Sequence, residues 1–72
     1  MTINVFFGKR VREARKLRGW SIERLSFESG VNKNYISDLE RGTRNPTLKV
    51  VDALCQALRI PVHVMLEPRI KK

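Results

Sequence analysis

The sequence predicts an all-α protein, a compact single domain of five short helices that spans residues 1–72. Three observations lead to this prediction. Apolar residues recur at spacings of three and four along most of the chain, which is the period of a helix that buries one face. Capping residues and glycines divide the chain into short segments. The composition, 42% hydrophobic and 31% charged, is typical of a globular domain, and 72 residues are enough for one.

The first predicted helix covers residues 6–18, with Asn4 as a candidate cap just before it. Its apolar positions fall at helical spacing and are Phe7, Val11, Ala14 and Leu17. Gly19 ends this helix, because glycine is the residue that most often follows a helical segment.

A pair of shorter helices around a tight turn is predicted over residues 21–41. Ser21 and Asn32 are of the types that cap helix N-termini. Gly30 can adopt the positive φ that a tight helix end requires, and Gly42 stops the second helix. Two capped helices joined by a glycine-centred turn of about four residues make a helix-turn-helix.

The last two helices are predicted over residues 48–58 and from Pro61 to about residue 66. Thr47 caps the fourth helix, whose core-facing positions are Leu48, Val51, Leu54, Cys55 and Leu58. Cys55 lies within that stripe, so we interpret it as a small buried hydrophobe. Pro61 can begin a helix because its missing N–H has no partner at the first position.

The second helix of the pair, residues 32–41, turns Ile36 and Leu39 inward and leaves a polar face outside. That face carries Lys33, Asn34, Ser37, Asp38 and Arg41. Side chains of these types can donate to or accept from base edges and phosphates. The alternative is a solvated polar face, which any amphipathic helix needs.

The net charge of +8 and the pI near 10.6 are unevenly distributed along the chain. Residues 1–20 carry six Lys/Arg and one Glu, whereas residues 21–46 carry four charges of each sign. Residues 47–72 carry five Lys/Arg and two acids. A neutral unit flanked by basic segments suits base recognition in the middle and phosphate neutralisation at the flanks. The alternative is a small basic protein that its charge keeps in solution.

Several classes of function are disfavoured by what the sequence lacks. One Cys and one His allow neither an internal disulfide nor a structural zinc site, so we expect no metal and no cofactor. No stretch is apolar enough for a signal peptide or a membrane span, which predicts a cytoplasmic protein without a membrane partner. No nucleophile–base set or phosphate-binding loop indicates an enzyme.

The pattern between residues 10 and 66 resembles a known family. The spaced matches are Arg15, Gly19-Trp20-Ser21, Leu25, Gly30-Val31, Ile36-Ser37, Leu39-Glu40-Arg41-Gly42, Arg44-Asn45-Pro46, Thr47-Leu48, Ala53-Leu54 and Ala57-Leu58. They resemble the Cro/phage-repressor-type (XRE) helix-turn-helix domain, which has the five-helix lambda-repressor-like fold. The runs Tyr35-Ile36-Ser37 and Arg44-Asn45-Pro46 are similar to those of the small controller proteins of restriction–modification systems.

This resemblance implies sequence-specific binding to double-stranded DNA, usually by a homodimer on a palindrome. It also implies an ion pair between Arg15 and Glu40 that ties the first helix to the end of the third. One position departs from the family. Ile22 stands where the family usually has a Gln whose amide touches a phosphate, so that contact is not expected from this side chain.

We expect two sets of DNA contacts. Base contacts are assigned to Lys33, as a donor to guanine N7/O6, then to Asn34, Ser37 and Asp38. Asp38 could accept from a cytosine amino group or could only hold Arg41 in place. Backbone contacts are assigned to Lys9, Arg10, Arg12, Ser21, Tyr35, Arg41, Arg44, Asn45 and Lys49. For Lys9, Arg10 and Arg12 the alternative is simple solvation of their helix. For Arg44 it is an ordinary polar loop, and for Tyr35 it is packing.

The C-terminal segment is too apolar for a short helix to bury entirely on one face. Its apolar residues, Val62, Val64, Met65 and Leu66, are predicted to form a homodimer patch, with Ile70 as a further candidate. The alternative is a closing helix that caps the core. Residues 67–72 are predicted to be a basic tail.

The sequence therefore suggests a homodimeric transcription regulator on a palindromic operator, of the kind that controls a restriction–modification operon, with RNA polymerase as a further candidate partner. The antitoxin of a toxin–antitoxin pair that autoregulates its operon is the alternative, although the short C-terminus leaves little toxin-binding surface. A cationic protein that coats membranes or condenses nucleic acid is a third hypothesis. Separate caps and breaks argue against the continuous amphipathic helix that it would need.

Overall fold

The computed structural model describes residues 2–67, which form five helices and no strand within that range. They are α1 (Ile3–Leu17), α2 (Ile22–Ser29), α3 (Lys33–Glu40), α4 (Leu48–Leu58) and α5 (Val62–Met65). The all-α prediction of five helices is therefore confirmed. The predicted tail, apart from its first residue, and Ile70 lie outside the described residues.

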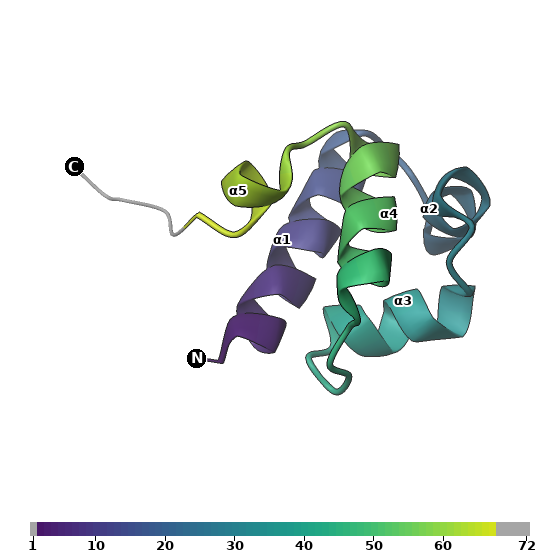
Figure 1. Ribbon diagram of the computed structural model, residues 1–72. Coiled ribbons are helices and arrows are strands. Elements are labelled where there is room, and N and C mark those ends of the chain that lie inside the picture. The colour runs from purple at the N-terminus through teal and green to yellow at the C-terminus, as the bar shows by residue number, and fades with distance from the viewer. Residues whose placement is uncertain (1, 68–72) are drawn as a thin grey trace.

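The longer helices α1 and α4 run side by side, and the three shorter ones surround them (Figure 1). Helix α3 lies across one end and packs against α1 and α2. Helix α2 packs on α4, and α5 packs on α1 and α4 at the side of the molecule away from α2. This arrangement leaves one long side of α3 exposed at the surface.

Every helix contributes to one apolar core. Its fully buried side chains are Phe7, Val11, Leu25, Ile36, Leu39, Leu54, Leu58 and Met65. Met65 is 1% exposed, so the structure assigns it to the core, where it fits the alternative of a closing helix and not the predicted dimer patch. Cys55 is also buried, and removal from solvent raises the pKa of its thiol, with a smaller contribution from Asp52.

Two predicted apolar stripes extend further than the core that they face. Leu17 and Leu48 are 85% and 87% exposed. Leu17 is the last residue of α1 and Leu48 is the first of α4, where fewer neighbouring elements surround a side chain. Helix α1 also starts earlier than predicted. Thr2, not Asn4, takes the extended N-cap conformation, and its carbonyl accepts from Phe6 N at 3.0 Å.

The caps predicted for the helix pair are present. Ser21 Oγ accepts from Arg24 N at 3.0 Å. Asn32 Oδ1 accepts from Asn34 N at 2.7 Å and from Tyr35 N at 3.3 Å. Gly30 ends α2 with φ of 75°, a conformation that costs a residue with a side chain about 1–2 kcal/mol. These local bonds set where each helix of the pair begins and ends.

Gly8 allows the backbones of α1 and α3 to come close together. A Cβ atom at this position would lie 2.0 Å from the carbonyl oxygen of Leu39 and 3.0 Å from its carbon. Both are backbone atoms and cannot rotate away as a side chain would. Sequence reasoning missed this residue, although a glycine inside a helical pattern indicates a packing or functional requirement.

Arg15 and Glu40 hold the same two helices together by charge. Arg15 Nε donates to Glu40 Oε2 at 2.9 Å and Nη2 donates to Oε1 at 3.0 Å, so the pair is bidentate, as the family resemblance implied. The side chains are only 9% and 3% exposed. Arg15 Nη1 also donates to the carbonyl of Trp20 at 2.8 Å. The hydrogen bonds to Glu40 raise the pKa of Arg15 further, against the opposing effect of burial.

We predict that Gly8→Ala destabilises the protein by about 2–3 kcal/mol, because overpacking against a backbone carbonyl forces α1 away from α3. Helix propensity alone predicts the opposite, a gain of about 1 kcal/mol. Urea denaturation followed by circular dichroism measures the difference. Gly19→Ala is the control, since its φ is +69° but nothing lies within 4 Å, so only the backbone cost of about 1 kcal/mol applies. A Gly8→Ala variant as stable as the wild type would contradict the close approach.

We also predict that Glu40→Gln lowers the free energy of unfolding by about 3 kcal/mol, because it leaves the guanidinium of Arg15 buried without its counter-ion. Glu28→Gln, which breaks the exposed pair with Arg24, should cost about 0.5 kcal/mol. The double variant Arg15→Met, Glu40→Leu should regain most of the loss, because it removes both charges. Equal denaturation midpoints for Glu40→Gln and Glu28→Gln would disprove the role given to this pair.

Candidate nucleic-acid interface

The outer side of α3 carries the residues assigned to base contacts. Lys33 and Asn34 are exposed, and Ser37 and Asp38 are half-buried, while Ile36 and Leu39 face the core. The structure thus brings the four predicted side chains to one surface, on a helix whose opposite face is fixed. A surface of donors and acceptors on a single short helix can enter a groove of double-stranded DNA.

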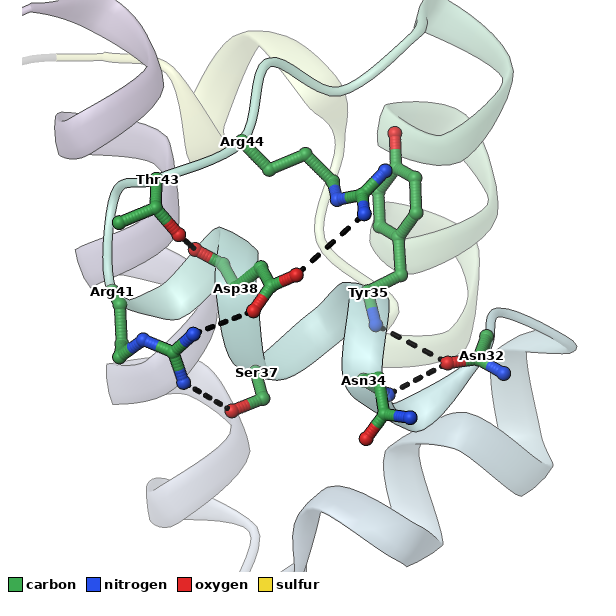
Figure 2. A network of polar contacts seen from close by, with 8 residues as sticks. All are labelled: Asn32, Asn34, Tyr35, Ser37, Asp38, Arg41, Thr43 and Arg44. Carbon is green, nitrogen blue, oxygen red and sulfur yellow. Dashed lines mark hydrogen bonds and ion pairs between the residues drawn. The ribbon is translucent and has the colours of Figure 1, made fainter.

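The carboxylate of Asp38 connects two arginines on this surface (Figure 2). Arg41 Nη2 donates to Asp38 Oδ1 at 2.6 Å, and Arg44 Nη2 lies 3.6 Å from Asp38 Oδ2. Arg41 Nη1 also donates to Ser37 Oγ at 3.1 Å. Asp38 therefore holds Arg41, as the second of its two proposed roles requires, and it also pairs with Arg44. The contact with a cytosine amino group stays a prediction.

The ring of Tyr35 contacts Arg44, which lies in the loop between α3 and α4. The guanidinium carbon of Arg44 lies 4.3 Å from the centre of its ring, within the range of a cation–π contact (Figure 2). The tyrosine is partly buried against the core, so its ring both packs and supports Arg44. Thr43 fastens the start of the loop, because its N and Oγ1 each donate to the carbonyl oxygen of Asp38 at 3.0 Å.

A hollow separates the beginning of α2 from the exposed side of α3. It is lined by Arg15, Ser21, Ile22, Glu23, Lys33, Asn34 and Ser37. Lys33 Nζ lies 3.9 Å from Glu23 Oε2, and both side chains are mostly exposed. Sequence reasoning missed Glu23, because only the packing of α2 against α3 brings its carboxylate near Lys33. Its carboxylate partly neutralises the lysine assigned to guanine.

The remaining residues assigned to backbone contacts occupy several elements. Ser21 caps α2, Asn45 lies in the exposed loop before α4, and Lys49 is exposed in the first turn of α4. Lys9 and Arg12 are exposed on α1. The contacts of these residues with DNA phosphates stay predictions.

Arg10, which is also assigned to a phosphate, has partners within the protein. Its guanidinium donates to the carbonyl oxygens of Glu67 at 2.6 Å and Val64 at 3.1 Å, and it lies 5.5 Å from the centre of the Phe6 ring. Arg10 therefore binds the last turn of α5 and the segment just after it. The physical reason is that backbone carbonyl oxygens accept hydrogen bonds, and that a charged donor such as a guanidinium makes stronger ones than a neutral donor.

Some other kinds of site find no support in the described part of the chain. Residues 2–67 contain no group of three or more His, Cys, Asp or Glu side chains that could hold a metal ion. Among the same residues, no helix combines the length and apolar character that crossing a bilayer requires.

Comparison with known proteins places this geometry in a family. The family model described as "Helix-turn-helix" matches residues 11–64. The control protein C.BamHI of Bacillus amyloliquefaciens is 38% identical over 66 residues, which are 90% of this chain and 82% of that protein. The regulator SinR of Bacillus subtilis (strain 168) is 32% identical over 63 residues, or 86% of this chain and 57% of SinR. The chain thus spans little more than half of SinR.

Solved structures agree with the sequence matches. The restriction-modification controller protein C.AhdI from Aeromonas hydrophila superposes with a TM-score of 0.82 at 40% identity, over 86% of this chain and 94% of that one. SinR in complex with DNA superposes with a TM-score of 0.80 at 32% identity, over 85% and 98% of the two chains. From its sequence, its fold and the exposed side of α3, the chain belongs to the XRE-type helix-turn-helix family of DNA-binding transcriptional regulators.

Proposed function

We propose that this protein is a cytoplasmic transcriptional regulator that binds a palindromic operator as a homodimer and controls a restriction–modification operon. It carries no catalytic activity in this proposal. One observation supports it above the others. The polar side chains of Lys33, Asn34, Ser37 and Asp38 lie on the outer side of α3, and close packing at Gly8 and the Arg15–Glu40 pair hold this helix against α1. The control protein C.BamHI and the controller protein C.AhdI support the choice of operon.

In the proposed complex, α3 enters the major groove, and Lys33 donates to guanine N7 and O6. Asn34 and Ser37 contact neighbouring base edges, while Arg12, Arg41, Arg44 and Lys49 face phosphates. Two such helices related by a two-fold axis would lie about 34 Å apart, one turn of DNA. The structure of SinR in complex with DNA supports this use of the fold, because 98% of that chain superposes on this one.

The proposed dimer interface is the exposed side of α5. Val62 and Val64 are 37% and 36% exposed, and Leu66 is half-buried beside them. Arg10 holds the end of this short helix against α1, so its apolar side chains keep a defined direction. Helix α5 lies away from α3 (Figure 1), so a partner on α5 leaves α3 accessible to DNA. RNA polymerase would be a further partner if the regulator activates transcription.

Lys33→Ala is expected to relax the preference at one base pair in each half-site, because a good contact to a base edge discriminates by about 1–3 kcal/mol. Selection of bound duplexes from random DNA measures this preference. The matched control is Lys49→Ala, which removes the same charge from α4. It should weaken binding to all sequences alike and flatten the dependence on log salt by about one unit. If Lys33→Ala and Lys49→Ala changed the selected sequences equally, the assignment of Lys33 would be wrong.

Val64→Asp is expected to convert the dimer into monomers, because it places a charge in an apolar contact between two copies. Sedimentation measures the mass in solution, and operator affinity should fall in parallel. Phe27→Asp is the control. Phe27 is 83% exposed on α2, at the opposite side of the molecule from α5, and its replacement should leave the mass unchanged. If Phe27→Asp dissociated the dimer while Val64→Asp left it intact, the interface would lie on α2 and not on α5.

A further inference from the structure

Asp38 lies less exposed than the two arginines that it binds. Its side chain is 32% exposed, against 62% for Arg41 and 45% for Arg44. A partner that approaches the outer side of α3 would therefore meet the guanidinium groups more readily than the carboxylate. Direct recognition of a base by Asp38 would instead require its carboxylate to be more exposed than the two arginines.

Each arginine is held by Asp38 and by one further group. Arg41 also donates to Ser37 Oγ, and Arg44 also lies over the ring of Tyr35 (Figure 2). Arginine side chains lose considerable rotamer entropy when a ligand immobilises them, so prior positioning lowers the cost of binding. Asp38 is the group that the two arginines share.

The carboxylate also opposes any polyanion. Both of its oxygens face guanidinium groups, at 2.6 Å and 3.6 Å, so accepting from a cytosine amino group would mean sharing or giving up one of these contacts. Its negative charge weakens the attraction of the arginines for phosphates of any sequence. Only a duplex whose shape lets it contact Arg41 and Arg44 in the directions in which they are held would recover this lost affinity.

We propose that Asp38 is a positioning residue for DNA recognition and not a base-reading one. Its carboxylate presents Arg41 and Arg44 in fixed directions and lowers the affinity for DNA of unrelated sequence, which together raise the ratio of operator to random-duplex affinity. The inference rests on the proposed function, and it assigns specificity to a residue that contacts no base.

The test compares Asp38→Ala with Glu28→Ala, using the operator obtained by selection and a random duplex. Glu28→Ala is matched because it also removes an acid that pairs with an arginine, at 2.8 Å, on the neighbouring helix α2. Asp38→Ala should lower the operator-to-random ratio about two- to tenfold, as expected for two exposed ion pairs. Its random-duplex affinity should rise, with a salt dependence steeper by up to about one unit. Glu28→Ala should leave the ratio unchanged.

A variant that lacks both arginines distinguishes positioning of the arginines by Asp38 from recognition of a base by Asp38. In the Arg41→Ala, Arg44→Ala protein, adding Asp38→Ala should change the ratio no further, because the carboxylate has nothing left to position. Asp38→Glu should restore much of the wild-type ratio. The variants should stay folded by circular dichroism, because the bonds from Thr43 go to the backbone carbonyl of Asp38.

The inference is overturned if Asp38→Ala leaves the ratio unchanged, or if it lowers the ratio equally in the Arg41→Ala, Arg44→Ala background, which would mark Asp38 as a base reader. Failure of the proposed function looks different, because the wild-type protein would then select no preferred duplex at all. A wild type that selects an operator while Asp38→Ala behaves like Glu28→Ala would reject this inference alone.

Discussion

The contact between α1 and α3 is the constraint on which the rest of this structure depends. An eight-residue helix such as α3 is not stable alone in water, so its direction must come from its neighbours. Gly8 of α1 allows the backbone of α3 to approach closely, and the bidentate Arg15–Glu40 pair fixes the orientation of α3. A buried ion pair tolerates little displacement, because a shifted partner would leave a charge without compensation.

The exposed side of α3 is more balanced in charge than the basic composition suggests. Lys33 lies beside Glu23, and Arg41 and Arg44 lie beside Asp38, so each of these cations has a carboxylate within 4.0 Å. Basic residues outside the helix pair supply the excess positive charge. Binding at α3 then depends mainly on the geometry of its contacts. Attraction to DNA by charge alone comes from the basic segments on either side of the helix pair.

Helix α5 gives a basic side chain of α1 partners within the protein and divides its own apolar residues between the core and the surface. Arg10 is a candidate for phosphate binding because it is basic and lies on α1, and its guanidinium donates to the carbonyl oxygens of Val64 in α5 and of Glu67 just after it. Met65 completes the core from that helix, while Val62 and Val64 stay at the surface. A helix of four residues can therefore close the core and still present an apolar edge.

The sequence by itself determined the helices of the pair and their limits, because caps at Ser21 and Asn32 and the positive φ of Gly30 are local properties of a few neighbouring residues. It also indicated which face of α3 is polar, since helical spacing places Ile36 and Leu39 together. Only the tertiary structure decided the partners of Arg10, the exposure of Leu48 and the need for Gly8. Each depends on which segments distant in sequence become neighbours, and that is set by packing of the whole core.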